Sequence, residues 1–130
     1  MILLDTHVWW WSLTEPENLS EIAFKTIAQI KTDQRAIASI SIWEFAMMAE
    51  KKRIELKVSV SKWLLSAIND TGLRVIELSP DIAIESCRLP GDFHKDPADR
   101  IIVATARIHN SSLVTKDQKI RDYPHVKAIW

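Results

Sequence analysis

The stretch His94-Lys95-Asp96-Pro97-Ala98-Asp99-Arg100 runs directly into the apolar segment Ile101-Ile102-Val103-Ala104-Thr105-Ala106. Asp96 and Asp99 flank a proline ahead of good helix formers, which predicts that both carboxylates lie in the first turn of one helix. Asp96 is a suitable N-cap, Pro97 suits the first helical position, and Asp99 stands where a capping box places its reciprocal carboxylate. Taken alone, the stretch favours helix capping over metal binding.

Length and charge predict one domain with no overall attraction to nucleic acid. The chain has 130 residues, 47% of them hydrophobic, which is enough for a single domain over residues 1–130. Its 17 basic and 17 acidic residues balance, so RNA binding would have to come from local patches. The near-zero charge and six tryptophans suggest that a partner or a second subunit covers some apolar surface.

Cys87 is the only cysteine, which excludes an internal disulfide and a thiolate metal cluster. Its helical surroundings predict a packed, unreactive thiol. We expect a cytoplasmic protein, because a lone thiol fits a reducing compartment and Asp5 interrupts the apolar start of the chain. No apolar run reaches membrane-spanning length, so no membrane contact is expected.

Short apolar runs alternate with helical patterns along the chain. The strand candidates are residues 1–4, 36–40, 73–78, 112–115 and 126–130. The intervening segments predict helices, among them one capped by Ser41 with Glu44 in its first turn. This alternation is typical of an α/β fold with a parallel sheet covered on both faces and right-handed crossovers.

Four acids are predicted to meet at one edge of this sheet. Asp5 and Asp117 follow two strands directly, while Glu44 and Asp99 lie near the starts of two helices. Four carboxylates without matched basic partners would repel one another, so a cation must neutralise them. Oxygen ligands without cysteine or paired histidine favour Mg²⁺ or Mn²⁺. Such an ion can activate water for phosphodiester hydrolysis, which would leave 5′-phosphate and 3′-hydroxyl products.

Four segments of the chain resemble the acidic motifs of PIN-domain nucleases and, more closely, those of VapC toxins from bacterial toxin–antitoxin pairs. They are Leu3–His7, Ser41–Glu44, Asp96–Ala106 and Leu113–Asp117. The resemblance implies a PIN fold, a three-layer α/β/α sandwich with a parallel sheet of about five strands. It also implies Mg²⁺- or Mn²⁺-dependent endoribonuclease activity on RNA, a cognate antitoxin that blocks the site, and a homodimer.

The resemblance also implies roles for individual residues. Asp5 and Asp99 match the principal metal-binding acids, and Glu44 and Asp117 match the acids that complete the site. Thr115 matches a small hydroxyl residue that orders the acidic cluster. All four catalytic acids are present, so the sequence indicates an intact site.

Asp96 and Arg100 belong to the same motif as Asp99 and are expected to support it. Asp96 keeps its main role as the helix cap. Arg100 either pairs with an acid or holds the scissile phosphate, and the ion pair is the favoured interpretation. His7 and His94 flank site acids, where they either touch a phosphate or serve as ordinary loop residues.

Two further groups of residues are candidates for contact surfaces. The basic run Lys51-Lys52-Arg53 is most simply a solvated face, and RNA phosphate contact is the sharper hypothesis. The Trp9–Trp11 cluster is expected to be core or interface, with a stacking platform for bases as the alternative. This cluster and the helix bearing Met47 and Met48 are the candidates to meet the antitoxin or a second subunit.

Two other functions fit parts of the pattern. One is a catalytically silent PIN-like module that binds RNA without turnover, which the four intact acids argue against. The other is a receiver-type signalling domain, also a small α/β fold with an acidic Mg²⁺ pocket. A receiver needs an aspartate at the end of its third strand, whereas residues 73–78 are followed by Ser79-Pro80.

Overall fold

All five strands pair in parallel in one sheet of order β3-β2-β1-β4-β5 in the computed structural model, which describes residues 1–130. The strands are β1 (Ile2–Leu4), β2 (Arg35–Ala38), β3 (Arg74–Ile76), β4 (Ser112–Val114) and β5 (Ala128–Ile129). Each of the five predicted strands is therefore confirmed, with ends that differ by a few residues.

Helices fill every connection between the strands. They are α1 (Thr6–Thr14), α2 (Glu21–Gln29), α3 (Ile40–Glu50), α4 (Val60–Leu65), α5 (Pro80–Cys87), α6 (Pro97–Ile108) and α7 (Gln118–Arg121). Short 3₁₀ turns span Pro16–Asn18 and Thr32–Gln34, and α4 continues into a π-helical turn over Ser66–Asp70. None of the helices combines the length and the apolar character needed to cross a lipid bilayer.

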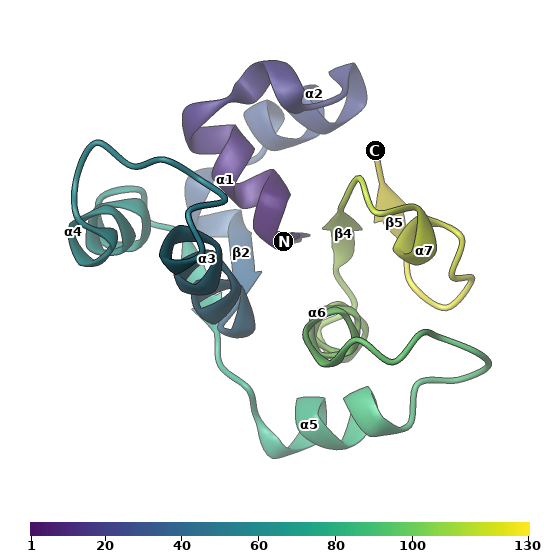
Figure 1. The fold of residues 1–130 in the computed structure, drawn as a ribbon. Helices are drawn as coiled ribbons and strands as arrows, with labels where there is room; N and C mark the ends of the chain where they lie inside the picture. Colours follow the sequence, from purple (N-terminus) through teal and green to yellow (C-terminus); the bar gives the residue numbers. More distant parts are fainter.

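Each face of the sheet has its own hydrophobic core. Successive side chains of a strand point to opposite faces, so Leu3 packs with one core while Ile2 and Leu4 pack with the other. The Leu3 core is closed by α5 and α6, and the second core is closed by α1, α2, α3 and α4. Figure 1 shows α5 and α6 on one side of the strands and α1 and α2 on the other. The predicted three-layer α/β/α architecture is confirmed.

The tryptophan cluster is mainly core. Trp9 and Trp10 are buried on α1 and pack around Phe45 and Trp63, whose rings stack on each other 4.1 Å apart. Met48 is buried as well, so it and the first two tryptophans offer no contact surface. The hypothesis that these three side chains meet a partner is wrong, because the second core already covers them.

Two local predictions are also corrected. Ser41 is not a helix cap, because α3 begins at Ile40 and its N-cap position is Ser39. The Ser41 side chain is fully buried. Glu44 consequently lies in the second turn of α3 instead of the first. Cys87 is exposed at the end of α5 rather than packed, because the buried positions of that helix are Ile82 and Ser86.

The strand order creates one switch point, between β1 and β4. From β1 the chain proceeds outward through β2 to β3, and it returns across the sheet to place β4 on the other side of β1. Loops that leave adjacent strands in opposite directions open a crevice at the carboxyl ends of those strands. The receiver alternative is wrong, because its fold has order 2-1-3-4-5 with a central third strand, whereas β3 here is an edge strand.

Candidate functional site

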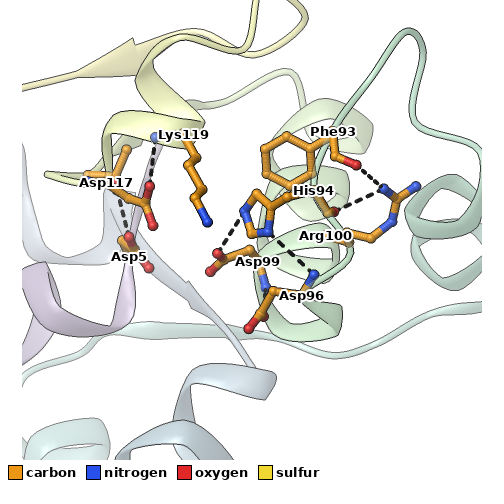
Figure 2. Close-up of polar contacts among 9 residues, drawn as sticks. Asp5, Phe93, His94, Asp96, Asp99, Arg100, Asp117 and Lys119 are labelled. Carbon is orange, nitrogen blue, oxygen red and sulfur yellow. Dashed lines mark hydrogen bonds and ion pairs between the residues drawn. The ribbon is translucent and has the colours of Figure 1, made fainter.

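Four carboxylates from four different elements line one pocket at the switch point. The pocket has a volume of about 370 Å³ and contains Asp5, Glu44, Asp99 and Asp117. Asp5 follows β1, Glu44 lies on α3, Asp99 is in the first turn of α6, and Asp117 precedes α7. The predicted convergence is confirmed. Figure 2 shows Asp5 and Asp117 on one side of the site and Asp96 and Asp99 on the other.

Thr115 connects the two acids that follow the central strands. Its fully buried hydroxyl donates to Asp5 Oδ2 at 2.6 Å and accepts the backbone N–H of Asp117 at 3.0 Å. Asp5 Oδ1 accepts the N–H of Thr6 at 2.8 Å and so caps α1. One hydroxyl thus orients the Asp5 carboxylate and fixes the backbone of Asp117, which agrees with the ordering role expected of Thr115.

Glu44 is oriented by the buried hydroxyl of Thr6, which in turn contacts the buried hydroxyl of Ser41. Thr6 Oγ1 lies 2.6 Å from Glu44 Oε1 and 2.8 Å from Ser41 Oγ. A hydroxyl has one proton, so Thr6 donates to the carboxylate and accepts from Ser41. Both hydroxyl residues are nearly inaccessible to solvent. The sequence pattern did not predict this role for Thr6. The position of Thr6 directly after Asp5 is the feature that could have indicated it.

Asp96 is the helix cap that the sequence predicts, but Asp99 does not complete a capping box. Asp96 caps α6 by accepting the Asp99 N–H at 3.0 Å. The N–H of Asp96 donates instead to His94 Nδ1 at 3.3 Å. His94 Nε2 lies 3.0 Å from Asp99 Oδ2, a close polar contact whose angle is poor for a hydrogen bond. The Asp99 carboxylate is therefore turned toward the pocket, beside the histidine (Figure 2).

Asp5, Glu44 and Asp99 have raised pKa values. Burial raises the pKa of Asp99 to about 7, and repulsion from Asp5, Asp96, Asp117 and Glu44 adds to the shift. Burial also raises the pKa of Asp5, against hydrogen bonds from Thr115 and Thr6. The pKa of Glu44 is raised by burial too, with the Thr6 hydrogen bond opposing it. Partial burial of clustered carboxyl groups creates a strong preference for a neutralising cation.

The donor set fits a hard divalent ion. Carboxylate and hydroxyl oxygens line the pocket, and the only cysteine of the chain lies elsewhere. As they stand, no three His, Cys, Asp or Glu side chains are grouped closely enough to hold an ion together. Asp117 Oδ1 accepts the Lys119 N–H at 2.8 Å, and Asp99 contacts His94. Repulsion keeps these carboxylates apart in the absence of a cation, so ion binding would require their side chains to move closer together.

Arg100 has a structural role that differs from both predicted ones. Its guanidinium donates to the backbone carbonyls of Ser86, Phe93 and His94 at 2.8, 3.0 and 3.2 Å. It forms no ion pair with an acid. Arg100 does not line the acidic pocket. Its contacts tie α6 to α5 through Ser86 and to the loop that carries His94, the latter shown in Figure 2.

The predicted basic run lies away from the acids. Lys51, Lys52 and Arg53 are exposed beyond the end of α3, and none of them lines the acidic pocket. Lys51 follows Glu44 by seven residues, which corresponds to about 10 Å along a helix axis. The basic side chain that does line the pocket is Lys116, next to Asp117 in sequence.

The largest hollow of the molecule is elsewhere and has different chemistry. It measures about 640 Å³ and includes Glu85 and Arg107. Arg107 is already neutralised by Glu85 at 2.6 Å and donates to the carbonyl of His125, also at 2.6 Å. The hollow therefore offers no group of free acids, and the functional candidate is the smaller pocket.

This fold and its acidic pocket define the PIN-domain class. The PIN domain family matches residues 2–126, and the chain belongs to this family. Over 128 residues it is 39% identical to ribonuclease VapC22 of Mycobacterium tuberculosis (strain ATCC 25618 / H37Rv), a match that covers 98% of this chain and 95% of that protein.

Solved structures share the same fold. VapBC2 from Rickettsia felis, bound to a promoter DNA fragment, aligns with a TM-score of 0.72 and 19% identity, over 99% of this chain and 98% of that one. A toxin–antitoxin complex from Klebsiella pneumoniae aligns with a TM-score of 0.66 and 24% identity, over 100% of this chain and 97% of that one. The backbone arrangement is therefore that of proteins found in toxin–antitoxin complexes.

Proposed function

We propose that this protein is a Mg²⁺- or Mn²⁺-dependent endoribonuclease and the toxin of a toxin–antitoxin pair. The observation that carries the proposal is the convergence of Asp5, Glu44, Asp99 and Asp117 on one pocket, in an environment that raises the pKa of Asp99 to about 7. The 39% identity to a ribonuclease over nearly the whole chain supports RNA as the substrate.

The site residues have distinct tasks in this proposal. Asp5 and Asp99 would be the principal ligands of the ion, and Glu44 and Asp117 would complete the set. When bound, Mg²⁺ or Mn²⁺ supplies Lewis acidity and lowers the pKa of water to generate a nucleophile for phosphodiester hydrolysis. Thr115 and Thr6 hold the carboxylates Asp5 and Glu44 in orientation through hydrogen bonds of 2.6 Å.

The proposal includes a protein partner. Structural neighbours of this chain are toxin–antitoxin complexes, which supports a cognate antitoxin that covers the acidic pocket. Exposed apolar side chains, including Trp43 at 56% and Ile84 at 52%, leave area for the antitoxin and for a second subunit in a homodimer. The protein encoded beside this one should co-purify with it and inhibit it. If the neighbouring protein neither bound nor inhibited this one, the toxin role would be contradicted, while the nuclease role would be unaffected.

The nuclease proposal is tested with purified protein and a single-stranded RNA. We expect cleavage in Mn²⁺ that stops in excess chelator and in Asp99→Asn, with products that carry a 5′-phosphate. Calorimetric titration with Mn²⁺ gives a second readout, because Asp99→Asn should weaken binding whether or not RNA is present. Asp33→Asn is the matched control. Asp33 is exposed and lies in the 3₁₀ turn before β2, at the end of the strand opposite to the pocket.

Each outcome has a clear meaning. Cleavage that persists in chelator or in Asp99→Asn would overturn the metal-dependent mechanism. RNA binding without cleavage under any divalent ion would favour the catalytically silent module.

A further inference from the structure

One wall of the acidic pocket consists of His7, Trp11 and Lys116, and we refer to it as the aromatic wall. All three residues line the same hollow of about 370 Å³ as the four acids. His7 and Trp11 are four residues apart on α1 and share one face of that helix. Lys116 lies between Thr115 and Asp117 in the chain, so β4 delivers it beside the acids.

The aromatic wall packs against the hydrophobic core on one side and lines the acidic pocket on the other. The Trp11 ring lies 6.3 Å from the ring of Trp130 and packs against the second hydrophobic core, which fixes its position. On the pocket side, the Lys116 ammonium lies 5.6 Å from the Trp11 centroid, and the His7 ring lies 5.6 Å from it at a tilt of 53°. Trp11 therefore presents an aromatic surface to the pocket from a rigid support.

The Lys116 ammonium forms no ion pair, although acids line the same pocket. Its only close partner among these contacts is the face of Trp11, a position that leaves the ammonium protons free for an anion. An anion that enters the pocket would find this cation beside an aromatic surface.

We infer that the aromatic wall binds one nucleotide of single-stranded RNA: a base stacks on Trp11 as the Lys116 ammonium leaves the face of that ring for a backbone phosphate. The inference rests on the proposed nuclease function, because the acids define where the scissile phosphate must lie. A tryptophan face stacks any base with little sequence preference, and a lysine contributes a point charge to the backbone. Bases in a duplex already stack on their neighbours, so the wall selects unpaired RNA.

The phosphate contact is tested by RNA binding in an Asp99→Asn background with Mg²⁺ present. The probe is a fluorescein-labelled single-stranded RNA of about ten nucleotides, followed by anisotropy over a range of salt concentrations. We expect Lys116→Met to weaken binding roughly five- to tenfold and to lower the slope of log K against log[salt] by about 0.7. Lys127→Met is the matched control, because Lys127 is exposed and precedes β5 at the opposite edge of the sheet.

The stacking contact is tested with two substitutions of Trp11 that keep different properties. Trp11→Leu keeps an apolar side chain without a ring and should weaken binding about 5- to 100-fold, whereas Trp11→Phe should recover most of it. The salt slope should stay unchanged in both. Thermal melting of each variant separates a loss of stacking from a loss of folding, since Trp11 also contacts the core.

The outcomes distinguish this inference from the function on which it rests. If the unmodified protein cleaves RNA while Lys116→Met and Trp11→Leu bind it normally, the aromatic wall has only a structural role and the inference is wrong. If Trp11→Leu and Trp11→Phe weaken binding equally, a base does not stack there. If the unmodified protein neither binds nor cleaves RNA, the proposed function itself fails.

Discussion

Thr115 donates a hydrogen bond of 2.6 Å to Asp5 across 110 residues of sequence. The same oxygen accepts the backbone N–H of Asp117, so one buried hydroxyl joins the ends of β1 and β4, orients the Asp5 carboxylate and fixes the backbone that carries Asp117. Because the two strands are neighbours in the sheet, this hydrogen bond crosses the switch point where the pocket opens.

Replacing Thr115 with valine should disorder the site while keeping the shape of the side chain. We expect a 10- to 100-fold loss of nuclease activity, the range typical of residues that orient metal ligands. The buried N–H of Asp117 would also lose its acceptor, at a cost of about 1–3 kcal/mol in the free energy of unfolding. Activity assays and urea denaturation measure the two effects. Thr115→Ser keeps the hydroxyl, and its failure to restore activity would contradict the orienting role.

The Thr6–Glu44 pair should behave as one unit. Thr6→Val removes the donor 2.6 Å from Glu44, so the carboxylate should turn away from the pocket and activity should fall about tenfold. In a double-mutant cycle with Glu44→Gln, the two losses in activity should be strongly non-additive. Additive losses would show that Thr6 acts through something other than Glu44.

The metal-free protein should lose stability as the pH rises from 5 to 8. The pKa of Asp99 is raised to about 7 in the folded state from an ordinary 3.8, so the folded state binds the proton more tightly across that window. Between pH 5 and 7 the difference in proton binding corresponds to at most about 3 kcal/mol, and the remaining exposure of the side chain (20%) reduces it. Urea denaturation in chelator at each pH measures the slope.

Two controls accompany this pH series. Asp99→Asn should reduce the slope and leave the contribution of Asp5 and Glu44, whose pKa values are raised in the same direction. Added Mn²⁺ should restore stability at pH 8, because it binds the ionised carboxylates. Parallel pH profiles for the two proteins would rule out Asp99 as the main source.

Arg100→Met should destabilise the fold without changing how RNA binding depends on salt. The guanidinium satisfies the carbonyls of Ser86, Phe93 and His94, and its loss should cost about 2–4 kcal/mol. Urea denaturation measures the loss, and anisotropy gives the salt slope. A smaller salt slope in Arg100→Met would indicate a direct phosphate contact and contradict the structural role.

The two functions of Asp96 can be separated by substitution. Asp96→Ala removes the N-cap of α6 and should cost about 1 kcal/mol of stability. Asp96→Ser keeps a capping oxygen but removes a negative charge that raises the pKa of Asp99, so that pKa should fall. NMR titration of the Asp99 carboxyl carbon measures the shift. An unchanged pKa would show that Asp96 acts on Asp99 only through the helix.

The predictions from the sequence succeeded where local pattern and chain order carry the information. Apolar runs that end in acids marked β1 and β4, and the parallel fold brings the ends of such strands to one edge. Asp96 was recognised as a cap because Asp-Pro at a helix start has a local signature. The start of α3 was misplaced by two residues because Ser41 resembles a cap, although its hydroxyl is buried in the interior, where it contacts Thr6.

The sequence alone determined the fold class and the four acids that share the pocket, because hydrophobic periodicity and the alternation of strands with helices are patterns of neighbours along the chain. Only the tertiary structure decided how the acids are held, with Thr6 on Glu44 and His94 beside Asp99. It also decided that Arg100 binds backbone carbonyls and no acid. Thr6 and Glu44 are 38 residues apart, and their contact depends on how α1 and α3 approach each other. Packing of side chains across elements sets that approach, and no pattern within a single segment encodes it.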